Sequence, residues 1–148
     1  MLNRITLKCF AWITLLLCSI SLFADRPLDE AMKRLSNVEV FAFGGIGRAG
    51  QTSKGEIDFR IVLSEPQPVV LSAFEKLYAT GNSQAKSYAL FGIRKLKPSR
   101  FMELLISAKA SVDNVEVMRG CIVTREPLRD VASQIDRGEW GEGFKSRN

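Results

Sequence analysis

Histidine is absent from the 148 residues of this chain. It is the usual base of serine and cysteine catalytic sites and the commonest side-chain ligand of zinc. Its absence therefore excludes the commonest catalytic triads and all histidine-ligated metal sites. Charge of either sign is modest, because 21 Lys and Arg face 16 Asp and Glu, for a formal net charge of +5. A chain of this length allows one domain with a sizeable core.

Cysteine is also scarce, and two of the three cysteines lie in a distinctive N-terminal segment. Arg4 and Lys8 are followed by an uncharged, mainly apolar run at residues 9–24 and then by Asp25. This order of basic, apolar and charged regions predicts a secretory signal peptide at residues 1–24.

The predicted cleavage site falls near residues 21–24. Cleavage after Ser21 places small residues at both recognition positions, whereas cleavage after Ala24 leaves Leu22 at one of them. An uncleaved anchor is the alternative, although a membrane-spanning helix needs about 20 apolar residues. We therefore expect an exported protein, located in the periplasm or outside the cell, with no stable membrane span once the signal is removed.

Removing the predicted signal peptide changes the net charge and the cysteine count of the remaining chain. Residues 1–24 contain two basic and no acidic residues, so the net charge falls by two, from +5 to +3. Cys121 then stands alone, which predicts no internal disulfide. A lone cysteine in an apolar stretch is expected to pack as a small hydrophobe, and an intermolecular disulfide is the alternative. Mild basicity without a recognition motif predicts no nucleic-acid partner.

Apolar periodicity predicts a mostly helical domain. The predicted helices cover residues 27–36, 53–65, 68–80, 82–97, 101–112 and 127–137. The second of these rests on a capping box formed by Ser53 and Glu56. Strict alternation of apolar residues at 57–63 leaves a strand there as the alternative.

Two segments far apart in the chain predict a small sheet. Residues 38–43 alternate and are rich in β-branched and aromatic side chains. Residues 114–117 repeat the Asn-Val-Glu-Val pattern of residues 37–40 and lead into a further apolar stretch. We expect 38–43 to pair with 115–124, which gives an α+β fold that is mostly helical and built on helical hairpins.

The predicted organisation is a signal peptide at residues 1–24, a single globular domain at 25–137 and a flexible tail at 138–148. The tail contains three glycines. Trp140 and Phe144 could nevertheless fold back onto the core.

One helical hairpin follows a recognisable pattern of small and apolar residues. These residues are Ala89 and Gly92 at the small positions and Ile93 and Leu96 at the apolar positions. With them, residues 82–110 resemble one unit of a HEAT-type helical repeat. Ala85 and Lys86 stand where that family usually has valine and arginine, and a solenoid normally needs three or more repeats. The resemblance implies a packed helical hairpin with a protein-binding surface, and it implies no catalytic residue.

Gly45, Gly47 and Gly50 form a G-x-G-x-x-G pattern directly after the predicted strand at 38–43. That pattern holds a dinucleotide where a helix begins within the glycines, so that its first amides bind pyrophosphate. Here the cap at Ser53 starts the helix later. We therefore predict no cofactor, no metal site, and a glycine loop that needs positive φ angles and close backbone approach.

Polar side chains gather in the loop 44–56 that contains these glycines. The candidate binding residues are Arg48, Gln51, Thr52, Ser53, Lys54 and Glu56. Beside free backbone amides at a helix start, they could hold an anion or the carboxylate of a partner. The alternative is that Ser53 and Glu56 only cap the helix while the other side chains are solvated.

An enzyme without histidine would need paired carboxylates, a Ser/Lys couple or an activated cysteine. Ser53 and Lys54 are neighbours at a helix start, so their side chains diverge. We therefore predict no catalytic residue, and a small exported envelope protein that binds another envelope protein, for example as an inhibitor or immunity-type protein. An envelope hydrolase that uses carboxylates near loop 44–56, such as Glu56 and Asp58, is the alternative.

Overall fold

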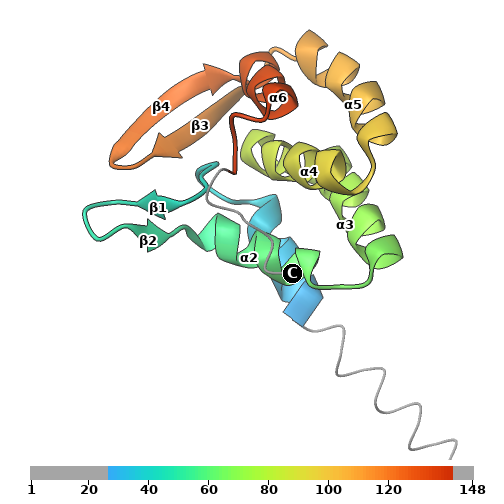
Figure 1. Ribbon diagram of the computed structural model, residues 1–148, viewed down its shortest axis with the longest axis horizontal. Helices are drawn as coiled ribbons and strands as arrows, with labels where there is room; N and C mark the ends of the chain where they lie inside the picture. The colour runs from blue at the N-terminus through green and yellow to red at the C-terminus, as the bar shows by residue number, and fades with distance from the viewer. Residues whose placement is uncertain (1–26, 142–148) are drawn as a thin grey trace, which may run out of the picture.

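Helices make up most of the fold in the computed structural model, which describes residues 27–141. Residues 27–36 are helical, and the later helices are α2 (Lys54–Leu63), α3 (Gln67–Thr80), α4 (Ser83–Leu96), α5 (Pro98–Ala110) and α6 (Leu128–Arg137). Two small antiparallel sheets pair β1 (Gly45–Ile46) with β2 (Gln51–Thr52) and β3 (Asn114–Arg119) with β4 (Ile122–Pro127) (Figure 1). The predicted α+β, mostly helical fold class is confirmed. The predicted signal peptide lies outside the described residues.

The start of α2 follows the predicted capping box. The Ser53 side chain accepts a hydrogen bond from the Glu56 N–H at 3.0 Å. The Glu56 carboxylate reaches back across the loop, where Oε2 accepts from the Gly44 N–H at 2.8 Å. The helix is therefore confirmed, and the strand alternative for residues 57–63 is wrong.

Helix α4 is the central helix of the domain. It packs against α3, α5, α6 and β3, and most of its residues are buried. Asn82 caps it, because its side chain accepts from the Ala85 N–H at 2.9 Å. Gly92 allows α3 to come close, since a Cβ at that position would lie 2.5 Å from Cε2 of Phe74. The helical hairpin predicted at residues 82–110 is therefore present as α4 and α5.

The predicted pairing of residues 38–43 with 115–124 is reduced to one parallel bridge between Phe41 and Val117. Phe41 donates from its N–H to the Glu116 carbonyl oxygen at 2.8 Å. No regular strand forms at residues 38–43. The two segments do meet, but the sheet that was predicted between them is wrong.

Residues 115–124 belong to a hairpin, because the chain reverses at Gly120. This glycine has a φ of +58° and permits a two-residue turn between Arg119 and Ile122, which are paired. β3 therefore pairs with β4, its neighbour in sequence, along all six residues. A single strand over 115–124 was the wrong prediction, since the turn lies in the middle of an apolar run.

Cys121 lies in this turn and is exposed. The prediction that it packs as a small hydrophobe is therefore wrong. It is the only cysteine among residues 27–141, so this part of the chain holds no disulfide. In the same range, no helix has the length and apolar character needed to cross a bilayer.

An aromatic cluster fills the core between the helices and residues 41–43. Its members are Phe41, Phe43, Phe59, Phe74, Tyr88, Phe91 and Trp140. Gly138 ends α6 with a φ of +78° and turns the chain back, which brings the ring of Trp140 to 4.5 Å from that of Phe41. Within the tail predicted at 138–148, Trp140 therefore folds back onto the core, as the sequence allowed. Phe144 lies outside the described residues.

Glu126 joins β4 to β3 and to α6 through hydrogen bonds. Its carboxylate accepts hydrogen bonds from Arg119, from Thr124 at 2.9 Å and from Gln134 on α6 at 2.9 Å. Burial acts to raise the pKa of Glu126, but these three hydrogen bonds outweigh burial and hold the pKa below the usual 4.5.

We expect the stability that Glu126 supplies to disappear in acid. Because its folded pKa lies below 4.5, the contribution is complete above about pH 4.5 and is lost as the pH falls through the folded value. Denaturant unfolding of the parent and of Glu126→Gln should therefore differ most at neutral pH and converge in acid. A difference that stays constant across this range would contradict the role of the ionised carboxylate.

Candidate functional site

Loop 44–56 forms the β1–β2 hairpin and the first turn of α2. Gly44, Gly47 and Gly50 have φ angles of +81°, +67° and +59°. A Cβ at Gly45 would lie 3.1 Å from the Gly50 carbonyl oxygen. The predicted need for positive φ and close backbone approach is confirmed, so the glycine pattern is explained by the turn itself.

The six candidate residues of this loop divide into two groups. Arg48, Gln51, Thr52 and Lys54 are exposed, whereas Ser53 and Glu56 are buried, with only 4% and 2% of their surface exposed. Besides capping α2, the Ser53 hydroxyl donates to the Ala42 carbonyl oxygen at 3.1 Å. Oε1 of Glu56 forms an ion pair with Arg60 at 2.5 Å. These two residues therefore support the fold, and the six side chains do not converge on one anion site.

Tyr88 is the centre of a buried polar network that the sequence did not reveal. Its hydroxyl donates to the Ala42 carbonyl oxygen at 2.8 Å, accepts from the Ala42 N–H at 3.1 Å and lies 3.4 Å from the Ser53 hydroxyl. Burial raises the pKa of Tyr88 to about 12. A Cβ on Gly55 would come within 2.6 Å of the same oxygen, so glycine is needed there. The network ties α4 to the start of α2.

Glu56 and Asp58, the two carboxylates of the alternative hydrolase site, form ion pairs with different arginines. Asp58 is buried and accepts from Nε of Arg34 at 3.0 Å and from its terminal nitrogen at 2.6 Å. Glu56 instead contacts Gly44 and Arg60. Nothing in this arrangement points to catalytic activity. Among the described residues, no cluster of three or more Cys, Asp or Glu side chains could hold a metal ion.

A groove of about 530 Å³ lies beside the start of α2 and is called the α2 groove below. Its lining consists of Arg34, Asn37, Val38, Glu39, Val40, Ile46, Ser53, Lys54, Gly55 and Asp58. Only Ser53 and Lys54 come from the predicted site. The opposite wall comes from residues 34–40, which sequence reasoning treated as a helix end followed by a strand. The alternation at 38–43 and the repeated Asn-Val-Glu-Val pattern at 37–40 marked this segment as a strand and gave no signal of a site.

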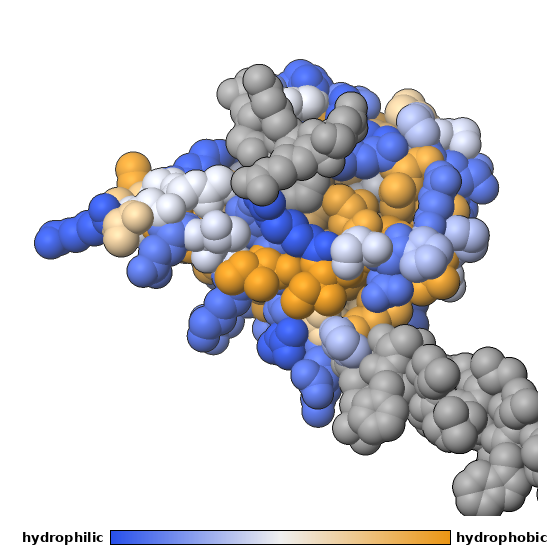
Figure 2. All heavy atoms as spheres, turned by 60° about the horizontal axis from the view of Figure 1, so that its bottom comes forward, coloured by the Kyte–Doolittle hydropathy of each residue, from blue (hydrophilic) through white to orange (hydrophobic). Residues whose placement is uncertain are grey.

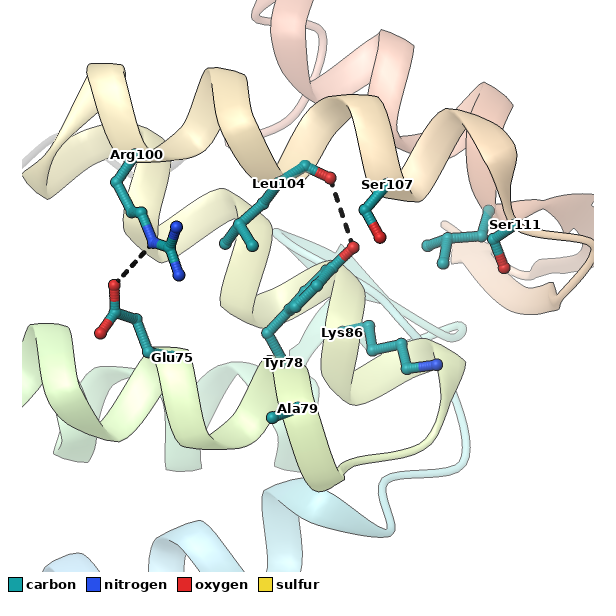
Figure 3. A pocket seen from close by; sticks show the side chains of 9 residues that line it. Glu75, Tyr78, Ala79, Lys86, Arg100, Leu104, Ser107 and Ser111 are labelled. Carbon is teal, nitrogen blue, oxygen red and sulfur yellow. Dashed lines mark hydrogen bonds and ion pairs between the residues drawn. The ribbon is translucent and has the colours of Figure 1, made fainter.

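A second cavity of about 390 Å³ opens between α3, α4 and α5 (Figure 3). Its charged side chains have partners within the fold, because Arg100 donates to Glu75 at 2.9 Å and Lys86 forms an ion pair with Asp113 at 3.0 Å. The Tyr78 hydroxyl donates to the Leu104 carbonyl oxygen at 3.3 Å. The bonds made by Arg100 and Tyr78 join α3 to α5. Because the polar side chains of this cavity serve the fold, the α2 groove is the better candidate site.

No family model, no curated protein and no solved structure matches this chain. Its function must therefore be argued from the geometry described above.

Proposed function

We propose that this chain is a small exported protein of the cell envelope that binds another envelope protein through the α2 groove and has no catalytic activity. The observation that carries the proposal is the make-up of the groove. Val38, Val40 and Ile46 supply apolar surface, and charged side chains stand around it. An apolar centre with a polar rim is typical of protein interfaces.

The charges at the rim favour one orientation of the partner. Arg34 and Asp58 neutralise each other through their paired hydrogen bonds. Lys54 and Glu39 have no ion-pair partner among residues 27–141, so one cation and one anion are free at the groove. A partner segment with apolar residues between an acid and a base would match this pattern, and repulsion between like charges would disfavour other registers.

Two features of the sequence support this role. The segment 1–24 predicts export, which would place the chain among envelope proteins. The resemblance of residues 82–110 to a HEAT-type unit implies a protein-binding role. Inhibition of a partner, or an immunity-type function, is one version of this proposal.

Photo-crosslinking in the producing cells tests the proposal. A photoreactive residue in place of Lys54 lies at the groove, and the same residue in place of the exposed Lys109 on α5 serves as the matched control. We expect one discrete adduct with a second envelope protein from the Lys54 variant and none from the Lys109 variant. No adduct at Lys54, or the same adducts at both positions, would overturn the proposal.

A further inference from the structure

The turns of the two β-hairpins form a second surface, distinct from the α2 groove. We call residues 47–51 and 118–124 together the paired tips. The hairpins project side by side from the helical body (Figure 1), and the Gly47 N–H donates to the Gly120 carbonyl oxygen at 2.9 Å. This hydrogen bond joins the turns, so the tips present one continuous surface.

The hairpin behind the tips is braced by charged pairs that join its two strands. Arg119 on β3 forms an ion pair with Glu126 on β4, and Arg125 lies 3.6 Å from Glu116. These pairs occupy both acidic residues of the hairpin. Arg119 and Glu126 also bond to Gln134, which joins the hairpin to α6.

Apolar side chains lie at the end of this projection. Ile122 is 68% exposed and Val123 is 51% exposed, beside the exposed Cys121 and Ala49. Figure 2 shows hydrophobic and hydrophilic residues together on the hairpin projection. The tips project from the helical body (Figure 1), so they suit a broad, deformable partner surface better than a partner that must fill a groove.

The charge of the paired tips has one sign. They contain Arg48 and Arg119 and no acidic residue. Arg48 has no ion-pair partner among residues 27–141. Arg119 is neutralised by Glu126, so Arg48 is the cation available to a ligand. Exposed apolar side chains beside an unpaired arginine match a lipid surface with anionic headgroups, where the apolar groups enter the interface and the guanidinium meets phosphate.

We propose that the paired tips bind the surface of an anionic lipid bilayer. Ile122 and Val123 enter the headgroup region shallowly, and Arg48 supplies the unpaired cation. Two apolar side chains and one unpaired cation give weak, reversible attachment, which needs both the apolar and the electrostatic contribution. The inference does not depend on the α2 groove or on its partner.

Vesicle flotation of the protein, purified as the cells produce it, tests this inference. The vesicles are phosphatidylcholine alone or phosphatidylcholine with about one third phosphatidylglycerol. The variants are Ile122→Ser/Val123→Ser at the tips and Ile106→Ser on α5 as the matched control, since Ile106 is 74% exposed and lies outside the tips. All are compared in the same chain, so any lipid affinity of the N-terminal segment is common to them.

We expect the parent and Ile106→Ser to bind the anionic vesicles equally, and the double tip variant to bind about tenfold more weakly. Arg48→Glu should also weaken binding, and raised salt should reduce the binding of the parent. Equal binding by the parent and the double tip variant would overturn the proposal. So would equal parent binding to both kinds of vesicle, or no binding by the parent, which would leave a protein as the partner of the tips.

Discussion

Replacing Trp140 by alanine is expected to lower the free energy of unfolding by about 3–5 kcal/mol. The indole is 8% exposed and contacts the ring of Phe41. The Arg119 guanidinium lies 4.4 Å from the indole ring, and the indole N–H donates to Gln134 at 3.0 Å. Removal of the ring would therefore open a cavity in the aromatic core and also release β3 from the segment after α6.

Urea unfolding followed by far-ultraviolet circular dichroism measures this change, because Trp140 is the only tryptophan among residues 27–141 and its loss removes the fluorescence probe of the folded domain. Trp140→Phe is the control. It keeps an aromatic ring beside Phe41 and loses the hydrogen bond, so we expect it to cost about 1 kcal/mol from that bond plus a smaller packing loss. If Trp140→Ala lost less than about 1 kcal/mol, the segment after Gly138 would not belong to the folded domain.

Alkaline pH is expected to destabilise the domain through Tyr88. The pKa of its phenol is 10.0 in an unfolded chain and about 12 in the fold, where burial disfavours the phenolate. The folded state therefore retains this proton over a range in which the unfolded state loses it. The contribution of the protonated Tyr88 to stability is complete below pH 10 and falls as the pH rises toward 12, by about 3 kcal/mol in all.

Tyr88→Phe isolates this effect. At neutral pH we expect the variant to lose about 1–3 kcal/mol, since the buried Ala42 N–H would lose its acceptor. Between pH 10 and 12, in denaturant titrations, the parent should lose stability faster than the variant. Parallel pH profiles for the two proteins would contradict the burial of an un-ionised Tyr88.

The helices were predictable because their signals are local. The Ser53 and Asn82 caps each bond to a backbone N–H three residues along the chain, so the sequence spacing alone marks these helix starts. The glycine loop was predictable for the same reason, since its φ requirements arise within a few residues. The turn at Gly120 also has a local cause, the positive φ of this glycine. It was missed because apolar residues on both sides of the glycine predicted one continuous strand.

The candidate site was only partly predictable. Ser53 and Glu56 were predicted as binding residues because their sequence neighbours are polar. In the fold both side chains are buried, and their hydrogen bonds join the loop, α2 and α4. The partners that decide this are remote in sequence, since Tyr88 lies 35 residues from Ser53. Lys54 lines the α2 groove only because residues 34–40 form its opposite wall.

The sequence by itself determined the mostly helical α+β class, the starts of the capped helices and the lack of histidine chemistry. Each follows from residue types or from spacings of a few residues. The tertiary structure decided which side chains are buried, as at Ser53 and Trp140, and which are exposed to solvent, as at Cys121. It also created the α2 groove and the paired tips, because each joins segments whose proximity depends on packing of the whole core.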